Sequence, residues 1–185
     1  MAPSQRIEPV TPPYTPEAQK LFDLVMPEGM EPLALFRTLA VSPRILSRFM
    51  RSGILDKGPV EIRDRELVIH RTTARCRCEY EWGVHVNAFA RPIGLSEEII
   101  AATVSEAWDA AIWTPRQAAL VRLCDELHET ASISKGLWDS LQEHFSPEQI
   151  IELIYTVGCY HTVSFFANGL GLQGEAFGER FPESR

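Results

Sequence analysis

The stretch ELVIHRTTARCRCEYEWGVH, residues 66–85, gathers two of the four cysteines and two of the five histidines of this 185-residue chain. A helix that begins near Cys78 would place Cys78, Glu81 and His85 on one stripe, because side chains three and four residues apart share a helix face. The indole of Trp82 lies on the same stripe, so we expect the stripe to face the protein interior. Ionisable groups are costly to bury alone, and Glu81 and His85 are therefore expected to pair.

A second helix precedes this one and carries Glu66. If the two helices form a hairpin, Glu66 approaches both Cys78 and His85. Arginines close to Cys78 would stabilise a thiolate at a helix start, whereas the neighbouring glutamates would oppose it. The direction of the pKa shift at this thiol therefore stays open at the level of sequence.

Four Ser/Thr-Pro pairs mark helix starts in the chain, because the hydroxyl can cap the first turn and the missing N–H of proline costs nothing there. Two of these starts, Thr114 and Ser146, are followed three residues later by Gln117 and Gln149, which is the pattern of a capping box. Apolar residues recur at three- and four-residue steps in the segments that follow. The pattern predicts an all-α fold with helices at about 16–26, 31–40, 43–54, 59–75, 78–91, 96–106, 115–131, 135–144 and 147–168.

The length of the chain suits one packed domain. We expect this domain at residues 16–185, after a flexible, proline-rich N-terminal tail at residues 1–15. The net charge of -7 argues against partners such as nucleic acid or an anionic membrane. Polar residues and glycines interrupt the apolar segment 150–172, so we expect no membrane span. Because the chain starts without an apolar signal sequence, we expect a cytoplasmic protein whose cysteines stay as thiols.

Cys76 and Cys78 form a Cys-x-Cys pair. On a regular helix their side chains point in different directions, so a direct disulfide would require non-helical backbone at this point. Together with His85 they would supply three metal ligands, but the cysteine spacing of zinc motifs is absent. We therefore name no metal site and no cofactor. His161, much later in the chain, is interpreted as a core histidine and not as a ligand.

The spacing Glu66-x11-Cys78-x2-Glu81-x3-His85, with Gly94-Leu95-Ser96-Glu97-Glu98 after it, resembles the carboxymuconolactone decarboxylase family, which includes alkyl hydroperoxidase D. The resemblance covers about residues 40–105. It implies an all-α fold of stacked helical hairpins of the alkyl hydroperoxidase D-like type. It also implies a homo-oligomer, such as a dimer, trimer or hexamer, that acts on a small-molecule substrate.

The resemblance implies two chemistries. In the hydroperoxidase branch the pattern is Glu-x11-Cys-x2-Cys-x3-His, in which two thiols cycle through a disulfide while Glu and His relay a proton. In the decarboxylase branch the cysteines are dispensable, and acid-base residues act on a small lactone carboxylate. Glu66, Cys78 and His85 match the first pattern, but Glu81 stands where the second cysteine belongs. The dithiol cycle is therefore incomplete, and Cys76 is interpreted as a bystander.

This departure favours a decarboxylase-like lyase that uses acid-base residues on a small lactone or carboxylated compound. One alternative is an antioxidant thiol peroxidase, an oxidoreductase with peroxiredoxin activity through a single cysteine. A further alternative is a non-catalytic, helical, oligomeric binding protein. The predicted catalytic residues are Glu66, Cys78, Glu81 and His85, and the predicted substrate-binding residues are Tyr80, Trp82 and Arg75.

Overall fold

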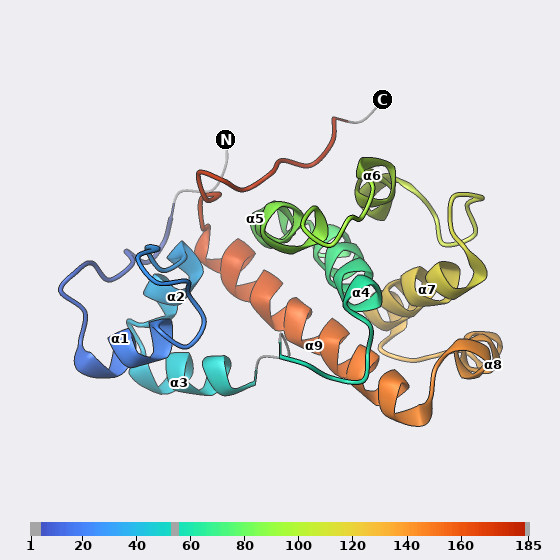
Figure 1. Cartoon of the computed structure of the whole chain (residues 1–185), viewed down its shortest axis with the longest axis horizontal. Coiled ribbons are helices and arrows are strands. Elements are labelled where there is room, and N and C mark those ends of the chain that lie inside the picture. Colours follow the sequence, from blue (N-terminus) through green and yellow to red (C-terminus); the bar gives the residue numbers. More distant parts are fainter. Residues whose placement is uncertain (1–4, 53–55, 184–185) are drawn as a thin grey trace.

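The computed structural model describes residues 5–52 and 56–183, and within these ranges it contains helices and no strand (Figure 1). The all-α prediction is confirmed. In chain order the elements are α1 Pro16–Phe22, α2 Ala34–Leu39, α3 Pro43–Arg51, α4 Ile62–Arg75, α5 Glu79–His85, η1 Val86–Ala90, α6 Glu97–Ser105, α7 Pro115–Thr130, α8 Lys135–His144 and α9 Pro147–Leu170.

The predicted capping boxes define the starts of α7 and α9. The hydroxyl of Thr114 accepts a hydrogen bond from the backbone N–H of Gln117, and Ser146 does the same with Gln149. In both cases the glutamine side chain bonds back to the backbone N–H of the capping residue, so two first-turn donors are satisfied together. These short-range signals locate helix starts because the partners are only three residues apart.

Helix α4 is the centre of the molecule. It contacts α5, α6, α7 and α9, and Figure 1 shows these helices arranged around it. Its residues 64–73 are all buried although several of them are charged. Arg71, for example, makes a bidentate ion pair with Asp125 of α7, at 2.7 and 2.8 Å. Such paired hydrogen bonds compensate the guanidinium for the water that it loses on burial.

Helix α9 crosses the bundle beside α4 (Figure 1). This helix has 24 residues, and an 18-residue window within it has a mean hydropathy of 1.3, so by length and composition alone it could cross a membrane. Ile150, Leu153 and Val157 are instead buried in the same core as residues of α4, α7 and α8. A helix that packs its apolar stripe inside a bundle is typical of the core of a globular protein.

The described part of the expected N-terminal tail, residues 5–14, lies along the chain's own helices. The backbone N–H of Arg6 donates to Leu170 O at 2.9 Å, and that of Val10 donates to Arg37 O at 3.2 Å. The ring of Tyr14 packs edge-on against Phe22 with centroids 5.1 Å apart. The division into a tail at 1–15 and one domain at 16–185 stays a prediction.

Candidate active site

The turn between α4 and α5 carries both cysteines of the Cys-x-Cys pair. Cys76 ends α4, Arg77 has a left-handed backbone with φ of +53°, and Cys78 precedes the first residue of α5. The predicted helix start near Cys78 is therefore confirmed. The backbone at this pair is non-helical, and both thiols are free.

The hairpin of α4 and α5 brings three of the predicted catalytic side chains together. Nδ1 of His85 lies 2.8 Å from Oε2 of Glu66, and Nε2 lies 3.4 Å from Oε1 of Glu81. The hydroxyl of Tyr160, from α9, is 3.1 Å from the same Nε2. Glu66, Glu81 and His85 are exposed by only 0%, 6% and 2%, so the cluster is inside the protein.

The two carboxylates decide the charge of the histidine. Burial lowers the pKa of His85, but the charge and hydrogen bond of Glu66, followed by those of Glu81, outweigh burial and raise it to about 9. His85 is therefore an imidazolium at neutral pH. It donates from Nδ1 to Glu66, and its Nε2–H faces Tyr160 and Glu81. Burial is also the largest cause that raises the pKa of the Tyr160 hydroxyl, which stays protonated.

Two carboxylate oxygens of the cluster have no hydrogen-bond partner among the described residues. These are Oε1 of Glu66 and Oε2 of Glu81, both buried. Oε1 of Glu66 lies 3.9 Å from the guanidinium nitrogen Nε of Arg65. A buried acceptor without a donor is unfavourable by about 1–3 kcal/mol, so each oxygen is ready to accept a hydrogen bond from a ligand.

His70 lies beside the cluster, and its pKa is shifted in the opposite direction to that of His85. Its ring centroid is 6.1 Å from that of His85, and its Nδ1–H donates to the backbone oxygen of Glu66 at 2.7 Å. Burial and the positive charge of His85 lower the pKa of His70 to about 4, against a smaller raising effect of Glu66. The cluster thus contains one charged and one neutral imidazole at neutral pH.

Cys78 is close to these residues but is not activated. Its side chain is completely buried, and burial raises the pKa of the thiol to about 11, with the backbone N–H of Glu81 opposing that rise only partly. The direction of the Cys78 pKa shift, which the sequence left open, is therefore set by the loss of water around the thiol. At neutral pH the Cys78 side chain is a thiol and not a thiolate.

The three predicted substrate-binding side chains have polar partners other than His85. Trp82 Nε1 donates to Thr103 Oγ1 at 3.1 Å, and Tyr80 Oη donates to Glu175 Oε1 at 2.6 Å. Arg75 forms an ion pair with Asp125 at 3.4 Å. Arg75 also pairs with Glu129. Their part in substrate binding stays a prediction, and the cation expected for a substrate carboxylate is already paired.

The predicted helix 78–91 divides at His85 into α5 and the π-helix η1. The wider turn is held by the backbone hydrogen bond from Arg91 N to Val86 O at 3.1 Å, which spans five residues. Short π-helical turns occur frequently at functional sites. Here the turn places the ring of Phe89, which is partly exposed, in a stack on His85 with centroids 4.7 Å apart.

The C-terminal segment 171–183 crosses the outer side of α5 (Figure 1). The backbone N–H of Glu179 donates to Gly83 O at 3.1 Å, and the ring of Phe181 packs on Trp82 with centroids 5.2 Å apart. A Cβ atom at Gly83 would lie 2.0 Å from Glu179 O, so only glycine permits this approach. The segment therefore covers the helix that carries Glu81 and His85.

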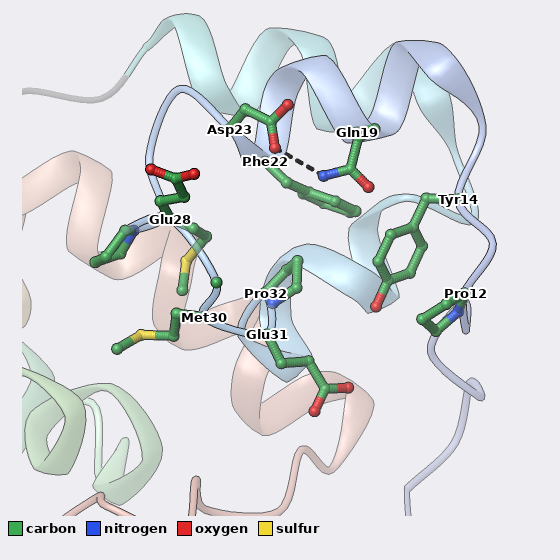
Figure 2. Close-up of a pocket in the computed structure, with 12 residues that line it drawn as sticks. Pro12, Tyr14, Gln19, Phe22, Asp23, Glu28, Met30, Glu31 and Pro32 are labelled. Atoms are coloured by element: carbon green, nitrogen blue, oxygen red, sulfur yellow. Dashed lines mark hydrogen bonds between the residues drawn. The ribbon is translucent and has the colours of Figure 1, made fainter.

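Neither of the two described cavities opens onto His85. The larger, of about 710 Å³, lies between α1 and the loop that follows it; Figure 2 shows Tyr14, Phe22 and the carboxylates of Glu28 and Glu31 around it. The smaller, of about 190 Å³, lies between Tyr80, the end of α9 and the C-terminal segment. The burial of Glu66, Glu81 and His85 likewise shows that this predicted catalytic cluster is enclosed by protein.

Sequence reasoning missed Tyr160 as a member of the cluster. It lies 75 residues after His85, and the spacing that identified the other residues does not extend into α9. A weak signal was present, because Val157, Tyr160, Ser164 and Ala167 form one buried stripe of α9 at steps of three and four.

The helical hairpin, with its buried glutamate-histidine relay and adjacent cysteine, defines an all-α protein of the alkyl hydroperoxidase D-like class. The model of the carboxymuconolactone decarboxylase family matches residues 43–126, a range that contains Glu66, Cys78, Glu81 and His85. This match, together with the shared fold of the structures described next, confirms the resemblance to the family that the sequence predicted.

Several solved structures share the fold. A peroxidase-related protein with an alkylhydroperoxidase AhpD core from Ralstonia eutropha JMP134 matches with a TM-score of 0.81 and 18% identity over 95% of each chain. A peroxidase-related protein from Silicibacter sp. TM1040 matches with a TM-score of 0.80 and 16% identity over 96% of each chain. The debrominase Bmp8, as a cysteine-to-alanine variant in complex with 2,3,4-tribromopyrrole, matches with a TM-score of 0.75 and 14% identity, over 96% of this chain and 95% of that one. No curated protein matches the sequence.

Proposed function

We propose that the protein is a cofactor-independent acid-base enzyme that acts on a small lactone or carboxylated compound, in the manner of a decarboxylase-like lyase. The observation that carries this proposal is the position of His85 between Glu66 and Glu81, which keeps a buried imidazole protonated at neutral pH. An imidazole that is already protonated at neutral pH can act as a general acid.

The proton would leave from Nε2. When a lactone acid loses CO2, the C–C bond breaks and its electron pair remains on the substrate as an enolate. His85 delivers the Nε2 proton to the carbon and becomes neutral, while Glu66 on Nδ1 keeps the ring in position. The Tyr160 hydroxyl, 3.1 Å from Nε2, is placed to donate to the enolate oxygen. Solvent then returns one proton to His85.

Glu81 has the role that distinguishes this chain from a dithiol enzyme. Its Oε1 supports the charge of His85 at 3.4 Å, and its buried Oε2 offers an acceptor to a substrate hydroxyl or water. A second cysteine at this position would provide neither. The substitution therefore supports proton transfer over disulfide exchange.

Substrate entry requires the closed cluster to open. The Phe89 ring lies on His85 and is partly exposed, and it belongs to the π-helical turn η1. We propose that rotation of this ring admits the substrate. The bound tribromopyrrole in the debrominase with the same fold supports a small ring compound as the class of ligand.

The test is turnover of a panel of small lactone acids in D2O, followed by mass spectrometry of the product. Wild type is expected to release CO2 and to incorporate one deuterium at carbon. Glu81→Gln and His85→Gln should lower kcat by about 10²–10⁴-fold, which is the usual contribution of a general acid or base. Glu98→Gln, an exposed glutamate of α6, is the matched control and should leave kcat unchanged. Unchanged turnover in Glu81→Gln would refute the assigned role.

A one-cysteine thiol peroxidase is the second candidate. It is supported by the spacing of Glu66, Cys78 and His85 and by the peroxidase-related proteins that share the fold. The complete burial of Cys78 and its raised thiol pKa oppose it. Sulfenic acid trapping after dilute peroxide distinguishes the two. Labelling of Cys78 ahead of the partly exposed Cys76 would replace the acid-base proposal, and if both activities are absent, a non-catalytic binding protein is preferred.

A further inference from the structure

A second cluster of reactive side chains lies where α4, α7 and α9 meet. Cys76 at the end of α4, His128 in the last turn of α7 and His161 of α9 place one sulfur and two nitrogen atoms within 4.8 Å of one another. Nδ1 of His128 is 3.0 Å from Nε2 of His161 and 3.9 Å from Sγ of Cys76. All three residues are partly exposed, so an ion from solvent can reach them, in contrast to the sealed thiol of Cys78.

The hydrogen bond of His161 to the backbone leaves its other ring nitrogen free to bind a metal ion. Its Nδ1 lies 2.9 Å from the backbone oxygen of Val157, which can only accept, so Nδ1 carries the hydrogen. The lone pair of Nε2 therefore points toward His128 and Cys76. This arrangement, with one ring nitrogen bonded to a carbonyl and the other free to bind, is the usual one for histidine ligands. His161 was expected to be a core histidine, and the structure shows that it faces a cluster instead.

The dimensions suit a tetrahedral ion. With Zn–N of about 2.05 Å and Zn–S of about 2.3 Å, tetrahedral angles separate two nitrogens by about 3.3 Å and a nitrogen from a sulfur by about 3.6 Å. The observed separations of 3.0 and 3.9 Å differ from these values by a few tenths of an ångström. Rotation of the His128 ring alone changes both distances. The backbone of Cys76 is held in place by a hydrogen bond from Asn168 Nδ2 to its carbonyl oxygen at 2.8 Å.

The surrounding charges do not exclude a cation. Burial is the largest cause that lowers the pKa of His128, and His161 and Arg75 lower it further. The Arg75 side chain is paired with Asp125 at 3.4 Å and with Glu129. Burial raises the pKa of the Cys76 thiol, so a divalent ion would displace the thiol proton as it binds, as metal ions do at cysteine ligands.

We propose that Cys76, His128 and His161 bind one zinc ion, with water in the fourth position. A thiolate and two neutral imidazoles match the ligand preference of Zn²⁺, and three protein ligands leave one coordination position open. The ion would join three helices that are far apart in sequence. It would also fix the turn that leads to Cys78 and α5. This site is separate from the acid-base cluster and does not depend on the proposed function.

The test uses the full-length protein, freed of metal by a chelator under reducing conditions, and Co²⁺ as a spectroscopic substitute for Zn²⁺. Wild type is expected to bind one Co²⁺ per chain, with the near-ultraviolet band of a cobalt-thiolate bond, and to release it when Zn²⁺ is added. Cys76→Ser should abolish the band. His128→Gln and His161→Gln should each weaken Zn²⁺ binding at least tenfold. Circular dichroism and the Tm of each metal-free variant establish that it is folded.

Two control variants make the result specific. Cys159→Ser removes another partly exposed thiol of α9, and His144→Gln removes a partly exposed imidazole of α8; both should bind Co²⁺ as wild type does. The proposal is overturned if the cobalt-thiolate band survives in Cys76→Ser, or if the controls weaken binding as much as the ligand variants do. Binding of Cu²⁺ alone, without Co²⁺ or Zn²⁺, would also overturn the assignment to zinc.

Discussion

The stability of the folded protein should pass through a maximum near neutral pH, because two adjacent buried histidines have pKa values shifted in opposite directions. His85 has a pKa of about 9 in the folded protein and His70 a pKa of about 4, against an ordinary value of 6.5 for both. A pKa raised by folding stabilises the protein below pH 6.5, and that stability is lost as the pH rises toward 9. A pKa lowered by folding stabilises the protein above pH 6.5, and that stability is lost as the pH falls toward 4.

For each histidine, the size of the effect follows from the difference between its pKa in the folded protein and the ordinary value of 6.5. One pKa unit corresponds to about 1.4 kcal/mol, so each histidine changes the free energy of unfolding by about 3 kcal/mol over its full range. This is a large fraction of the stability of a domain, which is about 5–15 kcal/mol. The thiols of Cys78 and Cys124, with pKa values raised to about 11 and about 12, act above pH 9 and do not obscure the peak.

Urea unfolding at a series of pH values between about 4 and about 9 measures this profile, since the midpoint concentration follows stability when the slope is constant. His85→Gln should remove the decline on the alkaline side. It should also reduce the acid decline, because the charge of His85 contributes to the lowered pKa of His70. His70→Gln should remove the acid decline caused by His70 and leave the alkaline one. A flat profile in wild type, or a peak that is unchanged in both variants, would refute the assigned protonation states.

Other consequences concern packing, thiols and assembly. Gly83→Ala should lower the free energy of unfolding by about 1–3 kcal/mol or detach the C-terminal segment, because the new Cβ would lie 2.0 Å from Glu179 O. Limited proteolysis would detect the detached segment. Gly158→Ala is the control, because a Cβ at Gly158 meets nothing within 4 Å. Iodoacetamide should alkylate partly exposed Cys76 in the native protein and reach fully buried Cys78 only on unfolding. Mass spectrometry that finds Cys78 modified first would contradict the closed site. The expected homo-oligomer should depend on the exposed face of α9, where the ring of Phe165 is 69% exposed. Phe165→Lys should therefore shift the mass measured by light scattering toward that of a monomer. An unchanged mass would place the subunit contact elsewhere.

The sequence could predict the part of the candidate site that depends on local spacing. Glu81 and His85 lie four residues apart on one helix, so their pairing follows from helix geometry. Glu66 could be added only on the condition that its helix and the next form a hairpin, and from the family spacing; the left-handed turn at Arg77 is a finding of the structure. The thiol pKa could not be predicted in the same way, because it depends on complete burial, and burial of Cys78 is a property of the whole bundle.

The sequence by itself determined the helical class, the helix starts at Thr114 and Ser146, and the glutamate-histidine spacing by which the chain resembles the family. These features rest on interactions between residues a few positions apart or on a spacing along one helix. Only the tertiary structure decided which groups from distant helices meet. Packing of α9 against α4 brings Tyr160 to His85 across 75 residues, and packing of α7 beside α4 brings His128 to Cys76 across 52. Such contacts depend on how whole helices pack, and no short sequence pattern records that packing.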